Sequence, residues 1–240
     1  MRTCVSTLVL VFLMGSVLEV SAADDHRSQT IDQLLDEFEK TEVDWRQLEV
    51  AKRVVSRRDS RVLQRLEPWL ENEDRHLRGN AAFIFAGLGD PRGLKTIGSI
   101  LSDRSERPEG QGISGGKFSV EAQIRADRYY AVHLLGGLKD LAAVDLLIPF
   151  LDDAEINYNV AWALGEIGDA RATSPLIDAL DDRDALVRVC AINALLKLRA
   201  TEALPKLRQL LSDDAMPSAG DRVSVAETAE AAIAKLQKEP

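Results

Sequence analysis

Apolar residues recur along the chain in a pattern that repeats every thirty residues or so. Twelve-residue segments that begin at Asp59, Asp90, Asp140, Asp169 and Ala200 align with one another, so their starts lie 31, 50, 29 and 31 residues apart. The seventh and eleventh positions after each start are apolar, and apolar positions four apart mark one face of a helix. They are Leu66 and Leu70, Ile97 and Leu101, Leu147 and Leu151, Leu176 and Leu180, and Leu207 and Leu211.

A second helix is predicted between each segment and the next. Nine residues before each new start stand Ala81, Ala131, Val160 and Ala191, followed four residues later by Phe85, Leu135, Leu164 and Leu195. Each unit is therefore a helical hairpin. A hairpin of this length buries its apolar faces only by stacking on neighbouring hairpins, which predicts a solenoid.

Short polar residues and glycines stand where these helices should begin and end. Thirteen residues after each start lies a side chain able to cap the second helix by accepting its free N–H groups. Those side chains are Asn72, Asp103, Asp153, Asp182 and Asp213. Gly89 and Gly168 fit the left-handed C-terminal cap of a helix.

These units resemble HEAT repeats, specifically the short HEAT-like repeats of the phycobilisome lyases. The resemblance runs from about residue 45 to residue 236 and rests on Ala-Leu-Gly-Glu-Ile-Gly-Asp at 163–169, the step from Asp182 to Val187-Arg188, and prolines in the first helices. Those prolines are Pro149, Pro175 and Pro205. The resemblance implies an all-α fold, an α-α superhelix of about five hairpins with capping helices at both ends.

In this family an aspartate and an arginine of successive units commonly form a ladder of polar contacts. Asp182 and Arg188 match that pattern. Asn157 stands where other units carry an arginine, so we expect the ladder to weaken there.

The start of the chain has the pattern of a secretory signal peptide over residues 1–22. Arg2 supplies a positive charge, residues 5–18 are apolar, and Val20-Ser21-Ala22 is a small-residue cleavage site. An uncleaved anchor is the alternative. A cleaved leader predicts a periplasmic or extracellular protein with no membrane association beyond the leader.

The remaining chain divides into an entry cap and a solenoid. Residues 23–58 are predicted to form N-terminal capping helices, with Thr30 able to cap the first, and residues 59–240 the repeats, which end in an exit helix at 221–237. Residues 104–118 fall in the unit of 50 residues and are rich in Gly, Pro and Ser, which predicts an inserted loop. Such a loop is either a binding element or an idle surface insertion.

An aromatic stripe is predicted along the concave face. If the second helices line that face, the positions seven and eleven residues before each start lie opposite the buried columns. They bring together Phe83, Tyr129, His133, Tyr158 and Trp162, with Asn80, Tyr130 and Asn159 at the edge. Aromatic residues exposed together are typical of interaction sites. The alternative is that the same side chains are covered and belong to the core.

Chemistry beyond binding finds little support in the residues. HEAT-like repeats also occur in a di-iron deoxyhypusine hydroxylase with His-Glu ligand pairs, but the three histidines here are followed by Arg27, Leu77 and Leu134. We therefore expect no metal, no cofactor and no catalytic residue. His76 is interpreted as a solvated or capping residue and Cys190 as a buried, inert thiol.

We therefore expect a non-enzymatic, exported scaffold that binds a protein or peptide along its concave face. The net charge of -9 disfavours nucleic acid as a partner. One alternative is a lyase-like or chaperone-like subunit that handles a chromophore or an apoprotein, although the lyases act in the cytoplasm and export argues against it. Another is a structural assembly module. The oligomeric state stays open.

Overall fold

The computed structural model describes residues 29–106, 119–218 and 222–238, and every regular element within them is helical. The predicted signal peptide and residues 107–118 of the predicted loop lie outside the described residues. Within the part of the chain that is described, none of the helices is both long and apolar enough to span a bilayer.

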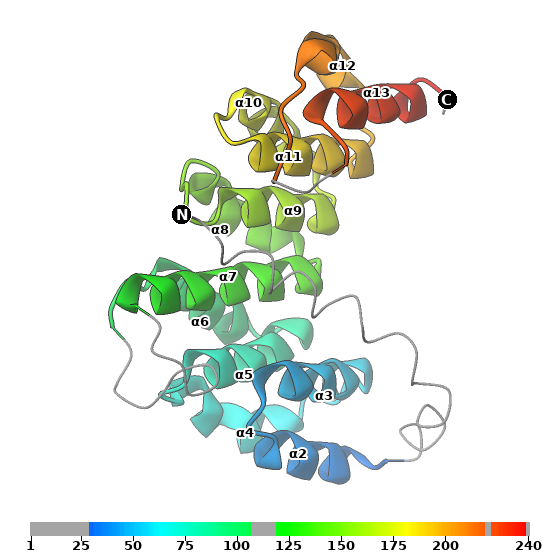
Figure 1. Ribbon diagram of the computed structural model, residues 1–240. Coiled ribbons are helices and arrows are strands. Elements are labelled where there is room, and N and C mark those ends of the chain that lie inside the picture. The colour runs from blue at the N-terminus through cyan, green and yellow to red at the C-terminus, as the bar shows by residue number, and fades with distance from the viewer. Residues whose placement is uncertain (1–28, 107–118, 219–221, 239–240) are drawn as a thin grey trace.

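The α-helices are arranged in successive hairpins, which confirms the all-α prediction (Figure 1). The hairpins are α2 (Ile31–Lys40) with α3 (Asp44–Ser56), α4 (Val62–Leu66) with α5 (Arg75–Gly87), α6 (Pro91–Ser102) with α7 (Val120–Leu138), α8 (Val144–Leu147) with α9 (Asn157–Ile167), α10 (Thr173–Asp178) with α11 (Ala185–Lys197), and α12 (Leu204–Gln209) with α13 (Val225–Leu236).

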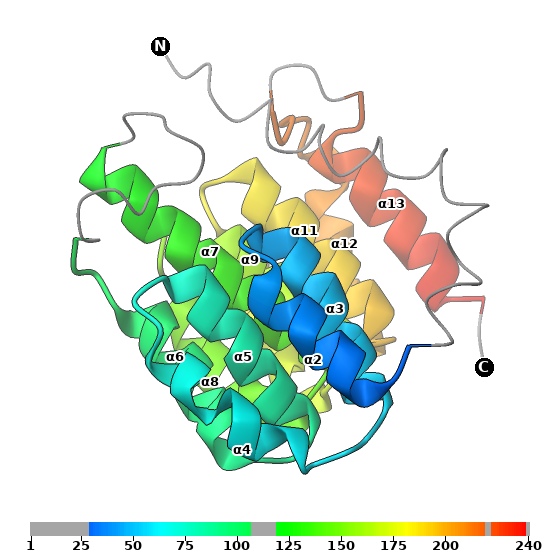
Figure 2. The same ribbon diagram turned by 90° about the horizontal axis from the view of Figure 1, so that it is seen from below.

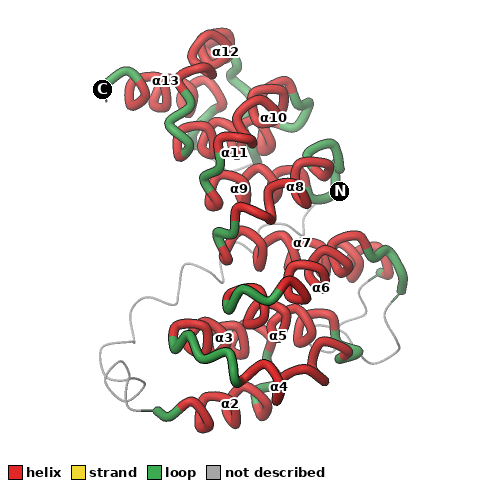
Figure 3. Tube along the Cα trace, turned by 180° about the vertical axis from the view of Figure 1, so that it is seen from behind, coloured by secondary structure: helices red, strands yellow, loops and turns green. Residues whose placement is uncertain are grey.

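The hairpins stack side by side into a superhelix. From α4 onward, the first helices of the hairpins form one layer and the second helices the other (Figures 1 and 3). The end-on view shows that the stack winds as it rises (Figure 2). The predicted interior column of the second helices is fully buried, at Ala81, Ala131, Val160 and Ala191.

Prolines explain why most first helices are short. Pro68, Pro149, Pro175 and Pro205 lie inside their first helices, and each of those helices is divided into a short α-helix with 3₁₀ turns. Proline lacks an N–H and its ring clashes with the preceding turn, so the i→i−4 ladder is interrupted. Pro91 occupies the first position of α6 instead, and α6 continues unbroken for 12 residues.

Helix ends carry the expected caps with one correction. Thr30 and Ser224 both form capping boxes, with Gln33 and Glu227 respectively. The polar side chains between the helices accept the N–H two residues further on, as in Asp182 with Asp184. They are therefore turn residues, and the N-caps of α5 and α11 are Asp74 and Asp184.

The residue before each unit start adopts the left-handed conformation. Gly89 and Gly168 have φ of 84° and 79°, which confirms their predicted role as caps. The corresponding residues of the other units also have positive φ, although they are not glycine. They are Arg58, Lys139 and Arg199.

The predicted polar ladder joins the units from α7 onward, whereas Arg78 donates to the backbone carbonyl of Asn72 within its own unit. Arg128 pairs with Asp153, and Arg188 pairs with Asp213 at 2.8 Å. Arg188 also donates to the backbone carbonyl of Asp182, so its carboxylate partner belongs to the following unit. Asn157 makes a single hydrogen bond of 3.1 Å to the Asp182 carboxylate. One ionic link is thus replaced by a neutral donor, as expected.

Candidate functional site

Four consecutive second-layer helices line a cavity of about 210 Å³. Its walls come from α3, α5, α7 and α9. The lining residues are Leu48, Lys52, Phe83, His133, Leu134, Gly136, Gly137, Lys139, Trp162 and Glu166. Three residues of the predicted aromatic stripe are therefore brought together here.

His133 and Trp162 form a parallel stack in the wall of this cavity. Their ring centroids lie 5.4 Å apart with an interplanar angle of 7°, and both side chains are half-buried. Gly136 allows this close packing, because a Cβ there would lie 3.0 Å from the Trp162 ring and from the Ala163 Cβ. The stack presents a rigid, flat, partly exposed surface, which is the geometry that binds planar ligands.

Tyr129 and Tyr158 continue the stripe one helical turn before His133 and Trp162. Tyr129 is 37% exposed and Tyr158 is half-buried. Burial raises the pKa of both phenols, and the pKa of Tyr129 is raised further by the nearby Tyr158. The two phenols therefore interact electrostatically, and neither of them lines the cavity.

Three of the predicted stripe residues are buried, which corrects the expectation of a uniformly open face. Phe83 is 5% exposed, Asn159 is 7% exposed and Asn80 is fully buried. The cause for Phe83 and Asn80 is Gly79, on the same face of α5. A Cβ at Gly79 would lie 2.8 Å from Leu134 Cδ1, so its absence lets α7 approach and cover this part of α5.

Asn80 and Tyr130 belong to a polar network that holds α3, α5 and α7 together. The Asn80 amide donates to the Asp44 carbonyl at 2.8 Å and to Gln47 at 3.0 Å. The half-buried Tyr130 donates its hydroxyl to Asn80 Oδ1 at 2.7 Å. These groups bond to one another, so they stabilise the wall of the cavity.

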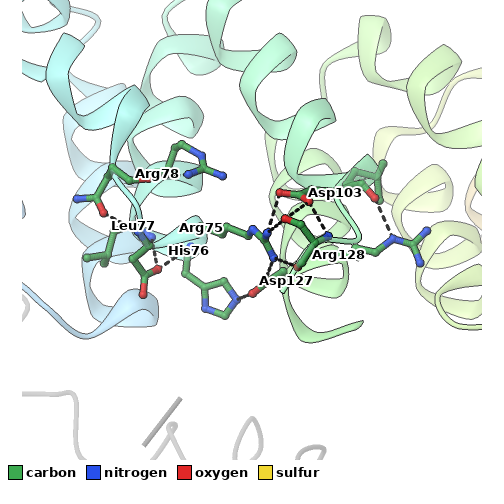
Figure 4. Close-up of polar contacts among 11 residues, drawn as sticks. Arg75, His76, Leu77, Arg78, Asp103, Asp127 and Arg128 are labelled. Carbon is green, nitrogen blue, oxygen red and sulfur yellow. Dashed lines mark hydrogen bonds and ion pairs between the residues drawn. The ribbon is translucent and has the colours of Figure 1, made fainter. Parts of the chain in front are cut away.

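A buried ionic cluster adjoins this network, and it corrects the interpretation of His76 as solvated (Figure 4). His76 Nδ1 lies 2.8 Å from Asp44, while Nε2 contacts Asp127 at 3.2 Å without good hydrogen-bond geometry. Arg75 binds the fully buried Asp127 at 2.9 Å and Asp103 at 2.8 Å. His76 and Asp44 are 32 residues apart in the sequence, and Arg75 and Asp127 are 52 apart. A local sequence pattern therefore cannot reveal this cluster.

Charged side chains surround the mouth of the cavity. Lys52 pairs with Glu49 at 2.7 Å, whereas Glu166 pairs with Lys197 and, at 3.6 Å, with Lys139. Burial lowers the pKa of His133, and the ammonium group of Lys52 lowers it further. The His133 ring is therefore neutral at pH 7.

Other candidate chemistry receives no support from the described residues. They contain no group of three or more His, Cys, Asp or Glu side chains that could hold a metal ion. Cys190 is half-buried, and burial raises the pKa of its thiol to about 11, so it stays protonated as predicted.

A second cavity of about 420 Å³ lies in the outer layer between α6 and α8. Its lining is apolar except for Lys95 and Ser102 at the edge, and none of the stripe residues reaches it. It provides an internal comparison for the cavity of the inner layer.

Comparison with known proteins identifies the repeats. The family model of HEAT repeats matches residues 121–188 and 152–219. A phycocyanobilin lyase alpha subunit from Synechococcus elongatus is 40% identical over 96 residues, which is 35% of each chain. Deoxyhypusine hydroxylase from Schizosaccharomyces pombe is 35% identical over 117 residues, or 46% of this chain and 35% of that relative. The match thus spans about a third of these relatives.

These relatives correct two predictions. They are named as a lyase subunit and a hydroxylase, so the prediction of a non-enzymatic protein that only binds a protein or peptide is contradicted. The findings favour the lyase-like alternative. The predicted signal peptide at residues 1–22 lies outside the described residues, so export stays a prediction.

Proposed function

Because this chain is a HEAT-repeat protein, we propose that it functions as a lyase-like subunit that holds a chromophore, or a chromophore-bearing protein, on its inner face. The observation that carries the proposal is the joint occurrence of two features. Phycocyanobilin lyase alpha subunits are 34–40% identical to part of this chain. The inner face also has an aromatic-lined cavity with His133 stacked on Trp162.

The size and shape of the cavity favour a planar ligand of which only part is enclosed. Small-molecule sites usually measure about 300–1,000 Å³, and this cavity has about 210 Å³. A conjugated ring placed between Phe83 and the His133–Trp162 stack would leave the rest of a linear tetrapyrrole outside. Tyr129 and Tyr158, one helical turn before His133 and Trp162 on the same helices, offer further partly exposed aromatic surface.

Among the two kinds of relative, the lyases fit these residues better. A hydroxylase of the kind that the sequence resembles would need paired metal ligands, and the described residues offer no suitable group. A chromophore site needs stacking surfaces and a pocket, which the inner face provides. Location outside the cytoplasm, inferred from residues 1–22, stays a prediction.

The test is a titration of the purified protein with phycocyanobilin, followed by visible absorbance. We expect saturable binding at one ligand per chain. Gly137→Leu should abolish it, because Gly137 lines the cavity and a Cβ there meets only Phe83, at 3.8 Å. Helical content should stay at the wild-type level.

Gly98→Leu is the matched control. Gly98 is also a helical glycine with open space, where a Cβ would lie 3.8 Å from Leu146 in the outer cavity. It should bind phycocyanobilin as the wild type does. Equal binding by Gly137→Leu and Gly98→Leu would show that the inner cavity is the wrong site, and absence of binding by the wild type would contradict the proposed function.

A further inference from the structure

We propose that the inner cavity selects a planar conjugated carboxylic acid, and that the ammonium group of Lys139 binds the acid group. This inference rests on the proposed function and adds the chemical class of the ligand and the residue that selects it. It is drawn from the backbone conformation of Lys139, the position of that residue at the cavity and its weak ion pair.

Lys139 occupies a backbone position where glycine is the favoured residue. It caps α7 with φ of 54° and ψ of 30°, in the left-handed region. Gly89 and Gly168 take the same conformation at the same place in neighbouring units. A residue with a Cβ is disfavoured there by about 1 kcal/mol relative to glycine, so the lysine is kept at a cost in backbone energy.

The helix dipole alone accounts for a cation at this position but not for a contact with the cavity. Arg58 and Arg199 also have positive φ at the ends of their helices, where positive charge is favoured. Neither of them lines the inner or the outer cavity. Lys139 differs because it is part of the cavity lining.

The charges at the cavity mouth leave Lys139 available for an acidic ligand. Its contact with Glu166 is long, at 3.6 Å, and its side chain is 63% exposed. Glu166 also pairs with Lys197, whose ammonium lies closer. Lys52, which also lines the cavity, adds a second ammonium that is held by Glu49. An incoming carboxylate can therefore pair with Lys139 while Glu166 keeps Lys197 as its partner.

The apolar and aromatic residues that line the cavity indicate the shape of the rest of the ligand. Phe83, Leu48 and Leu134 are apolar, and the His133–Trp162 stack is flat, so a conjugated ring is the complementary shape. The neutral His133 adds no positive charge to attract an anion. Recognition of the acid is thereby assigned to Lys139, and stacking to the rings.

The experiment compares phycocyanobilin, which carries propionic acid groups, with its dimethyl ester. The proteins are the wild type, Lys139→Gly and the control Arg58→Gly. Lys139→Gly should fold at least as stably as the wild type, because glycine is already used at this position in two units. We expect it to bind the free acid about three- to fivefold more weakly, as for loss of one solvent-exposed ion pair.

The ester separates charge recognition from other effects of the substitution. The wild type should bind the ester about three- to fivefold more weakly than the acid, and Lys139→Gly should bind both about equally. Arg58→Gly should keep the preference of the wild type. If the wild type binds acid and ester alike, or if Lys139→Gly keeps the preference, this inference is wrong while the proposed function stands. If neither compound binds, both fail.

Discussion

The same repeat position is core in one unit of the inner face and surface in others. Seven residues before each unit start, Lys52 is exposed, Phe83 is buried, His133 and Trp162 are half-buried, and Asn193 is exposed. The column four residues earlier passes from the buried Gly79 to the exposed Tyr129. The repeat pattern therefore predicts which face of a helix a residue lies on. The approach of the next helix decides whether that face is buried or exposed to solvent.

The closed region is held by a buried ionic cluster, and the open region by stacked rings together with an ion pair of the ladder. Where α3, α5 and α7 meet, the buried cluster of Arg75, His76 and Asp127 links the helices. Where α7 meets α9, His133 stacks on Trp162 and Arg128 of α7 pairs with Asp153, just before α9, while the neutral contact of Asn157 with Asp182 follows in the next unit. The two regions should therefore respond differently to substitution.

The largest expected effect is loss of charge at the centre of the closed region. Asp127→Asn should lower the free energy of unfolding by about 3 kcal/mol or more, because it leaves Arg75 and His76 buried with a neutral neighbour. Asp145→Asn is the matched control, since its pair with Arg171 is exposed and worth less than about 1 kcal/mol. Urea denaturation measures both.

Hydrogen exchange shows whether the loss is local. Asp44, at the start of α3, is a partner of His76, so Asp127→Asn should raise amide exchange first in α3. If Asp127→Asn lost no more stability than Asp145→Asn, the buried cluster would not be what holds the closed region together.

Replacing Phe83 or Trp162 by alanine should give a smaller but clear difference in the free energy of unfolding. Phe83→Ala should cost about 3–4 kcal/mol, as for a buried aromatic residue, and Trp162→Ala about half as much, because its ring is partly exposed. Thermal and urea unfolding of the two variants provide the comparison. Equal losses would place Trp162 in the core and remove the distinction between the two regions.

The smallest expected effect concerns pH in the open region. The folded protein has a lowered pKa at His133, so folding favours the neutral ring. Its contribution to stability is present above the unfolded pKa of about 6.5 and is lost as pH falls through the lowered folded value. His133→Phe should therefore lose less stability than the wild type between pH 7.5 and pH 5. Parallel pH profiles would contradict the assigned environment of His133.

The sequence was sufficient to predict the hairpins, because each unit repeats its own apolar columns. It also predicted that His133 and Trp162 share a face with Phe83, since all three stand at one repeat position. Burial of Phe83 was not predictable from that position. It depends on the contact of Gly79 with Leu134, which joins residues of different units.

Long-range polar contacts were missed for the same reason. His76 stands beside an N-cap in the sequence, and its main-chain N–H does donate to Asp74. Its side chain, however, meets Asp44 and Asp127 from two other helices. Only the superhelical winding brings those helices together, and the apolar pattern carries no information on that winding.

The most direct test of the inner-face site is a crystal structure of the protein with phycocyanobilin bound. We expect one ring of the ligand between Phe83 and the His133–Trp162 stack, in the cavity formed by α3, α5, α7 and α9. Ligand density in the outer cavity between α6 and α8, with the inner cavity empty, would contradict the account.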